Sequence, residues 1–327
     1  MLTSETKPTP KPSQPGKIEK MKPVVRKLTL YSAVPPQGIL SQLDSGYVAE
    51  PSDKGTLLSI WEKASRVYSS ELSSVRSAIG ADDIRDVHDV DKRLVENVLS
   101  QAKLYPPHDS HPTSIYEVRI SKLVTPQLTL NVSRAQSRAQ IRQGMSVPEL
   151  FPIMFESAGK PDLITRQILG MDQTNGTVLF TSYDEDVRLH HPPQYRQLRV
   201  NEKDPKSPSL ENVCIAIGGG LPLATAFRIQ IAPDLTRLIL TNGIHRAYRL
   251  AEAGYEWCPL VVSDLIPMEF PPQFVDLPKD ILLSQDANPP LITDFLNPKV
   301  MIPLDYFTLL RTVQLNWSFS QYVTVLK

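Results

Sequence analysis

The chain has 327 residues, 41% of them apolar, and its 35 basic side chains balance 35 acidic ones. This is enough apolar material for one or two ordinary cores in water, while a net charge of zero argues against a molecule-wide surface for nucleic acid or for an anionic membrane. Two cysteines, Cys214 and Cys258, are too few for a disulfide framework and lack the spacing of a zinc site.

The sequence carries no signal for a membrane or for export. No apolar run approaches the roughly 20 residues of a membrane helix, and the first residues are polar and rich in proline. We therefore expect a cytoplasmic protein without membrane contact. The 30 prolines against 14 glycines favour many short elements over long helices.

Residues 1–27 form a tail rich in lysine and proline, with seven basic and two acidic side chains and hardly any core-forming residue. Such a segment does not offset the entropy of ordering, so we expect it to be disordered. Residues 28–112 are predicted to be a helical region followed by a linker, a region that offers a surface for a protein partner. Apolar residues recur at helical spacing over 57–72 and 90–104, with Ser52 or Asp53 capping the first helix and Asp89 or Asp91 the second.

The proline-rich segment 105–113 reads as the linker, and we expect His108 and His111 in it to be exposed. After it, residues 113–327 change to a strand-like pattern that predicts an α+β domain with a proline-rich C-terminal extension. Strands are predicted at 115–123, 128–132, 177–182, 226–231, 237–240, 260–262 and within 312–326, and helices at 134–143, 148–157 and 244–253.

The most informative stretch is residues 226–265. It reads as a β-hairpin with its turn at Pro233 and Asp234, then a helix from Ile244 that Gly254 ends, then an apolar strand. A strand that turns at glycine into a helix presents unpaired N–H groups and the positive end of the helix dipole. Gly243 permits a close approach, and His245 and Arg246 add charged donors for a phosphate or carboxylate.

A purely structural interpretation of the same turn stays open. In it Gly243 only makes the turn, Arg246 pairs with a carboxylate such as Glu252, and His245 is a surface residue.

The order of strand, Asn242-Gly243-Ile244-His245-Arg246, helix, glycine and apolar strand resembles the phosphate-binding signature of the ParB/sulfiredoxin superfamily. The resemblance covers about forty residues closely. It implies a ParB/sulfiredoxin-like mixed sheet with helices, and a turn in which Asn242, Gly243, His245 and Arg246 hold the phosphates of ATP or CTP, with magnesium.

The chain also departs from that superfamily. The reactive cysteine of sulfiredoxins falls at Ile244, which excludes their chemistry, and only 61 residues follow Ile266, too broken by proline for the helix-turn-helix of chromosome-partition ParB proteins. Relatives that phosphorylate an amino acid use a carboxylate base near the turn, where this chain has Asn242. Asp234, Glu252 and Asp264 are the possible substitutes.

Other clusters of polar residues favour a structural role over a binding site. The acidic and histidine residues within 184–191 lack the spacing of a helical zinc site, and 86–91 reads as the start of a helix, so no metal site is predicted. Arg134, Arg138 and Arg142 form a basic stripe on one helix face, which we expect to be solvated.

The sequence thus favours binding of an anionic ligand, a nucleotide or another phosphorylated small molecule, and does not decide whether a reaction is catalysed. The alternatives are a non-catalytic scaffold for protein interactions that has kept the fold, and a ParB-like nuclease or nucleic-acid binder, for which the neutral charge and the lack of a metal cluster are unfavourable.

Overall fold

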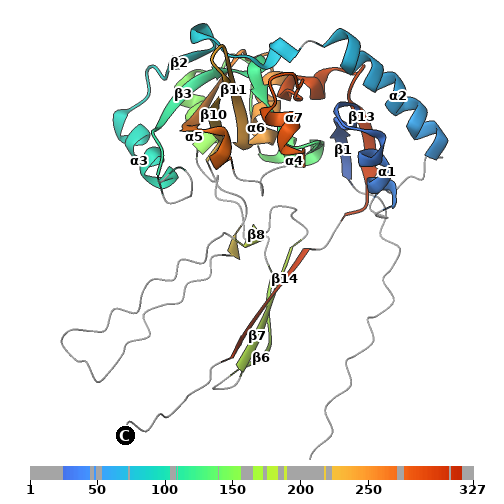
Figure 1. Ribbon diagram of the computed structural model, residues 1–327. Coiled ribbons are helices and arrows are strands. Elements are labelled where there is room, and N and C mark those ends of the chain that lie inside the picture. The colour runs from blue at the N-terminus through green and yellow to red at the C-terminus, as the bar shows by residue number, and fades with distance from the viewer. Residues whose placement is uncertain are drawn as a thin grey trace, which may run out of the picture.

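The computed structural model describes residues 25–44, 48, 54–72, 74–103, 108, 110–138, 140–155, 165–171, 175–182, 188–189, 217–218, 223–270, 276–308 and 311–318. Helices combine with mixed sheets in these residues, so the predicted α+β class is confirmed (Figure 1). No helix in the described ranges is both long enough and apolar enough to pass through a membrane.

A six-stranded sheet forms the centre of the molecule (Figure 1). In spatial order its strands are β2 (Ile84–Asp86), β3 (Thr113–Arg119), β12 (Trp257–Leu265), β10 (Thr225–Ala232), β11 (Leu235–Asn242) and β4 (Leu123–Val124). β10 is parallel to β12 and β11 to β4, and the other neighbours are antiparallel. Residues 258–263 of β12 are buried without interruption, as in a strand that is covered on both faces.

The predicted hairpin is confirmed. β10 and β11 pair antiparallel around the two-residue turn Pro233–Asp234, with Ala232 opposite Leu235. Proline fixes φ at the start of this turn, and aspartate is among the residues that turns favour. The apolar strand predicted after the helix is β12, where Val261 lies opposite Thr225 of β10.

The predicted helices are present, with shifted ends. The described helices are α1 (Pro36–Asp44), α2 (Lys54–Glu71), α3 (Lys92–Ala102), α4 (Val132–Arg138), α5 (Val147–Phe155), α6 (Ile244–Glu252) and α7 (Lys279–Leu283). Asp91 caps α3, since its Oδ1 accepts a hydrogen bond from the Arg93 backbone N–H at 2.8 Å. Ser52 and Asp53, the predicted caps of α2, lie outside the described residues.

The expected solvated arginine stripe is wrong. α4 ends at Arg138, so Arg142 is not on the helix, and Arg134 is only 9% exposed. The side chain of Asn131 accepts a hydrogen bond from the Arg134 N–H at 3.0 Å, which fixes the start of α4. Arg134 lies beside the fully buried Ala135, and the Nε and Nη2 atoms of its guanidinium are buried as well.

The predicted boundary of the N-terminal tail is also wrong. β1 (Val25–Thr29) begins inside residues 1–27 and lies between β13 (Ile302–Tyr306) and β5 (Thr129–Asn131) in a three-stranded sheet. Backbone groups make this pairing, with Val25 opposite Tyr306, so a segment with few apolar side chains is ordered by its hydrogen bonds.

The N-terminal region belongs to the same body as the rest. β2 extends the main sheet, and Arg76 forms an ion pair with Asp294, with Nη1 to Oδ1 at 2.5 Å and Nη2 to Oδ2 at 2.7 Å. The Trp61 indole donates to the Tyr31 carbonyl at 3.0 Å, which fastens α2 to the segment after β1.

His108 contradicts the prediction of an exposed linker histidine. Its side chain is 4% exposed, and its Nδ1 lies 2.6 Å from Ser263 Oγ. Thr113 is opposite Ser263 in the β3–β12 ladder and contacts the same hydroxyl at 2.6 Å. These polar partners allow the imidazole to be buried beside Phe227, at 5.4 Å between ring centroids.

The proline-rich C-terminal part supplies core residues as well as an extension. Phe270, Leu282, Ile292 and Phe295 are buried, in or near α7 and the short 3-10 helices η5 (Pro267–Glu269) and η7 (Ile292–Leu296). A further sheet, β14 (Arg311–Ser318), β7 (Asn175–Ser182) and β6 (Thr165–Met171), extends away from the body in Figure 1. β7 and β14 confirm predicted strands, whereas β6 and the short pair β8 (Arg188–Leu189) and β9 (Ile217–Gly218) were not predicted.

Candidate functional site

The predicted turn has the expected backbone. Asn242 ends β11, Gly243 has φ +96° in the left-handed region, and α6 begins at Ile244. A Cβ on Gly243 would lie 2.8 Å from the Ala224 Cβ and 3.1 Å from the Ala224 Cα. Glycine is therefore needed for the backbone conformation and for the close approach of Ala224, a neighbour from this chain itself.

Asn242 ties the turn to the start of β10. Its Nδ2 donates to the Leu223 carbonyl oxygen at 2.7 Å. One residue earlier, the Thr241 hydroxyl lies 2.6 Å from the Thr225 hydroxyl. The side chain of Asn242 thus positions residues 223–225 against the turn.

Arg246 lies across the same turn. Its Nη1 donates to the Met154 carbonyl oxygen, near the end of α5, at 2.6 Å, and the same oxygen accepts the Ala224 N–H at 2.9 Å. Arg246 Nη2 lies 3.4 Å from the position that a Cβ on Gly243 would take. The guanidinium therefore lies directly over the N-terminus of α6.

The structure brings the four predicted residues together. His245 lies in the first turn of α6, and Asn242, Gly243, His245 and Arg246 are all half-buried. The N–H groups of Arg246 and Ala247 both donate to the Gly243 carbonyl, at 3.0 and 2.9 Å. The hydrogen bonding of α6 therefore begins at Gly243, the residue before the helix. The predicted set is a single compact corner between β11, α5 and α6.

The apolar face of α6 anchors this corner. Ile244, Ala247, Tyr248 and Leu250 are buried, and the first three follow the helical spacing i, i+3 and i+4. The Tyr248 hydroxyl donates to Glu252 Oε1 at 3.0 Å, and burial, followed by Glu252, raises the pKa of Tyr248 to about 12.

The carboxylates proposed as substitute bases lie away from the turn. Glu252 forms an ion pair with Arg249 near the far end of α6, so it is not the carboxylate partner of Arg246 that the purely structural interpretation named as an example. Asp234 is exposed in the hairpin turn at the opposite end of β11. Asp264 is held by Arg228, with Nε to Oδ1 at 2.5 Å and Nη2 to Oδ2 at 2.7 Å.

Cys258 does not supply the missing nucleophile. The residue is fully buried, and desolvation raises the pKa of its thiol far above the usual range, with a smaller opposing effect of Arg246. A buried thiol of this kind is inert.

The described residues include no group of three or more metal-ligating side chains placed to hold an ion. Most of the 184–191 run, with both of its histidines, lies outside the described residues, and in the 86–91 run Asp91 is a helix cap.

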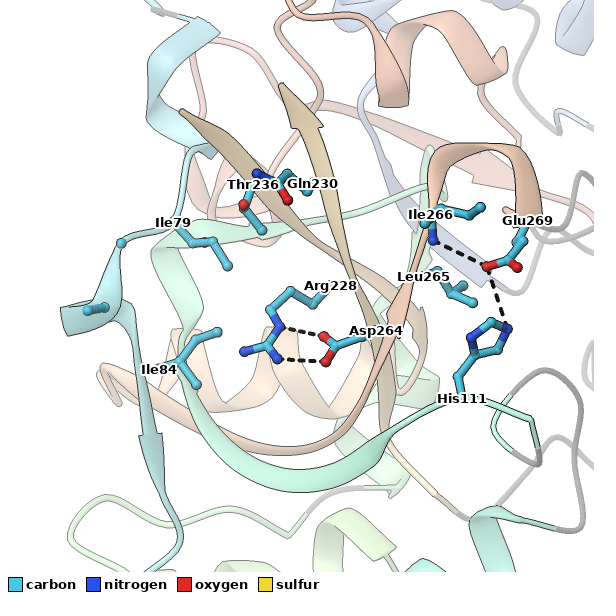
Figure 2. A pocket seen from close by; sticks show the side chains of 12 residues that line it. Ile79, Ile84, His111, Arg228, Gln230, Thr236, Asp264, Leu265, Ile266 and Glu269 are labelled. Atoms are coloured by element: carbon cyan, nitrogen blue, oxygen red, sulfur yellow. Dashed lines mark hydrogen bonds and ion pairs between the residues drawn. The ribbon is translucent and has the colours of Figure 1, made fainter. Parts of the chain in front are cut away.

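A cavity lies at another place on the sheet (Figure 2). It has a volume of about 850 Å³. The lining residues come from β10, β11, β12, η5, the start of β2 and the segments before β2 and β3. They are Ile79, Gly80, Ala81, Ile84, His111, Arg228, Gln230, Thr236, Asp264, Leu265, Ile266 and Glu269. None of the four residues of the predicted turn contributes to it.

Sequence reasoning missed the residues that close the turn and those that line the cavity. Met154 and Leu223 contribute carbonyl oxygens, which leave no trace in residue type. The pairing of Arg228 with Asp264 follows from the parallel register of β10 and β12, where the two residues are direct partners. Both strands were predicted from the sequence, but their register, which makes these two residues partners, was not.

Comparison with known proteins finds no protein that resembles this chain. No protein-family model matches the chain, and neither a curated protein nor a solved structure is similar to it. The resemblance to the ParB/sulfiredoxin superfamily thus depends on the residues of the turn and stays a prediction.

Proposed function

We propose that this protein binds an anionic phosphorylated ligand, a nucleotide such as ATP or CTP, at the corner formed by Asn242, Gly243, His245 and Arg246. The observation that carries the proposal is the position of Arg246, whose guanidinium lies over the N-terminus of α6, with Nη2 3.4 Å from the Cβ position of Gly243.

Two positive contributions coincide there. The N-terminus of α6 carries the positive end of the helix dipole, equivalent to about half an elementary charge. Arg246 adds a positively charged side chain at the same place, with its Nη1 donating to the Met154 carbonyl oxygen. A phosphate is the ligand that such a combination favours.

Within this proposal Asn242 has a positioning role, because its amide holds Leu223 beside the turn. His245 and Arg246 are the side chains that would contact phosphate. We assign no protein ligand to magnesium, since Asp234, Glu252 and Asp264 all lie away from the turn. A magnesium ion would accompany the phosphates of the nucleotide.

One observation favours the second candidate, a non-catalytic scaffold for protein interactions. Ala224 already fills the space beside Gly243 that a phosphate would approach, and the Met154 carbonyl already accepts a donor from Arg246. In a scaffold these contacts would have a structural role only, and the turn would bind no ligand.

The two candidates are separated by a thermal-shift and calorimetry screen of the full chain against ATP, CTP, GTP and inorganic phosphate, with and without magnesium. A ligand that binds the native state raises the melting temperature by mass action. Arg246→Gln should weaken nucleotide binding by about 10-fold or more.

Arg249→Gln is the matched control, because it removes an arginine of the same helix that pairs with Glu252. Equal affinities of wild type and Arg246→Gln, or no binding at millimolar nucleotide, would leave the scaffold as the better account.

A further inference from the structure

The cavity of Figure 2 lies far from the turn along the same hairpin. Asn242 at the turn is opposite Thr225, whereas Thr236 in the cavity is opposite Gln230. Arg228, which also lines the cavity, is three residues from Thr225 along β10, a separation of about 10 Å. A ligand in the cavity would therefore occupy a site separate from the corner at Gly243.

Arg228 forms the floor of the cavity. One edge of its guanidinium group binds Asp264, and the other edge is open to the cavity. Arg228 uses Nε and Nη2 for the two carboxylate oxygens of Asp264, at 2.5 and 2.7 Å. Among the described residues Nη1 makes no hydrogen bond, and in Figure 2 this nitrogen projects away from Asp264, on the side where Ile84 lies. Asp264 thus fixes the guanidinium plane, and the edge formed by Nη1 and Nη2 is presented to the cavity.

An open guanidinium edge is the geometry that binds a carboxylate through two parallel N–H···O bonds. The Arg228 side chain is 34% exposed, so it is accessible and yet partly shielded from water. Such shielding strengthens a contact between charges.

Acidic groups limit which anions fit. Asp264 lies next to Arg228, and Glu269 lines another wall, where its Oε2 is 3.6 Å from His111 Nε2. These two carboxylates repel a second negative charge on a ligand, so a monoanion is favoured over a dicarboxylate or a phosphate ester.

The remaining walls are largely apolar. The apolar lining residues are Ile79, Ala81, Ile84, Leu265 and Ile266, of which Ile266 is 52% exposed. The volume of about 850 Å³ lies within the range of small-molecule sites, which combine apolar walls with a few convergent polar groups.

We propose that this cavity binds a small monocarboxylic acid with an apolar body, its carboxylate on the open edge of Arg228 and its apolar part against Ile79 and Ile84. The proposal is independent of nucleotide binding at the turn.

Phenylbutyrate is a suitable probe, with phenylbutanol as its neutral counterpart and phenylsuccinate as a dicarboxylate. Binding to the full chain is measured by saturation-transfer NMR and isothermal titration calorimetry. We expect saturable binding of phenylbutyrate, weaker by about 10-fold for the alcohol and for the dicarboxylate, since each loses or opposes the charge-assisted contact.

Arg228→Gln should weaken phenylbutyrate binding by about 10-fold or more. Arg119→Gln is a matched control, because Arg119 is also 34% exposed, also lies on the main sheet and also pairs with acidic side chains, Asp83 and Glu256. It should leave the affinity for phenylbutyrate unchanged.

Ala81→Trp provides a second test that leaves every charge in place. Ala81 is exposed at the mouth of the cavity, so the indole should fill the space without disturbing the fold and should prevent binding. The proposal is overturned if phenylbutyrate does not bind, if alcohol and acid bind equally, or if binding survives either Arg228→Gln or Ala81→Trp.

Discussion

A hydrogen bond of 2.6 Å joins Arg246 Nη1 to the carbonyl oxygen of Met154, although the two residues are 92 positions apart. The Ala224 N–H donates to the same oxygen at 2.9 Å. Arg246 therefore links α6 to the end of α5 at the carbonyl that also binds the residue before β10. The residue predicted to bind phosphate also has a structural role.

This dual role leads to a prediction about stability. Arg246→Ala removes the charged one of two donors to the carbonyl oxygen of the buried Met154, so we expect the free energy of unfolding to fall by about 1–3 kcal/mol. Urea denaturation of the ligand-free protein measures the change. An unchanged unfolding midpoint would mean that the Met154 contact contributes nothing, and Arg246 would then serve the ligand alone.

Gly243 and Ala224 should be coupled in energy. Gly243→Ala places a Cβ 2.8 Å from the Ala224 Cβ and imposes φ +96° on an L-residue, so we expect a loss of about 2–4 kcal/mol. Ala224→Gly removes the 2.8 Å contact between the two Cβ atoms and leaves both the 3.1 Å contact to the Cα of residue 224 and the backbone strain. In a double-mutant cycle the pair should therefore cost less than the sum of the single changes. Strict additivity would contradict the close approach of these two residues.

The strands and helices around the turn were predictable because their signals are local. Ile244, Ala247 and Tyr248 follow helical spacing, and Pro233–Asp234 marks the hairpin turn. Gly243 marked the junction of strand and helix and the place of a close approach. In these residues the local pattern and the tertiary packing agree.

The contacts that decide what the turn can do were not predictable. The partners of Arg246 and Asn242 are backbone carbonyls 92 and 19 positions away, and a carbonyl oxygen is present in every residue. His108 and Arg134 were expected to be exposed because polar residues usually are, yet both are buried. His108 owes its burial to Ser263, which is 155 positions away.

The N-terminal boundary predicts a difference between two truncations. A chain that begins at Val25 keeps β1, and we expect it to melt at the same temperature as the full chain. A chain that begins at Leu30 lacks all five residues of β1 and leaves β5 and β13 without their common neighbour. We expect its melting temperature to fall by several degrees, at about 2–4 °C for each kcal/mol lost in a protein of this size. Differential scanning calorimetry of both proteins measures the difference, and equal melting temperatures would show that β1 adds no stability.

The hydroxyl of Tyr248 predicts a dependence of stability on alkaline pH. Burial and Glu252 raise its pKa to about 12 in the folded protein, from 10.0 for the free side chain, so the folded state keeps a proton that the unfolded state loses. Between these two values the unfolded chain binds fewer protons than the native one, and the free energy of unfolding should therefore fall as the pH rises, by up to about 1.4 kcal/mol per pH unit for this group. Tyr31 and Tyr68 also have raised pKa values, so the wild-type slope contains their contributions as well.

Tyr248→Phe isolates one contribution, because it keeps the buried ring and removes the ionisable hydroxyl. Denaturant unfolding at several pH values above about 9 should give a shallower decline for this variant than for the wild type. Parallel curves would mean that Tyr248 titrates alike in both states, which would contradict its burial against the sheet.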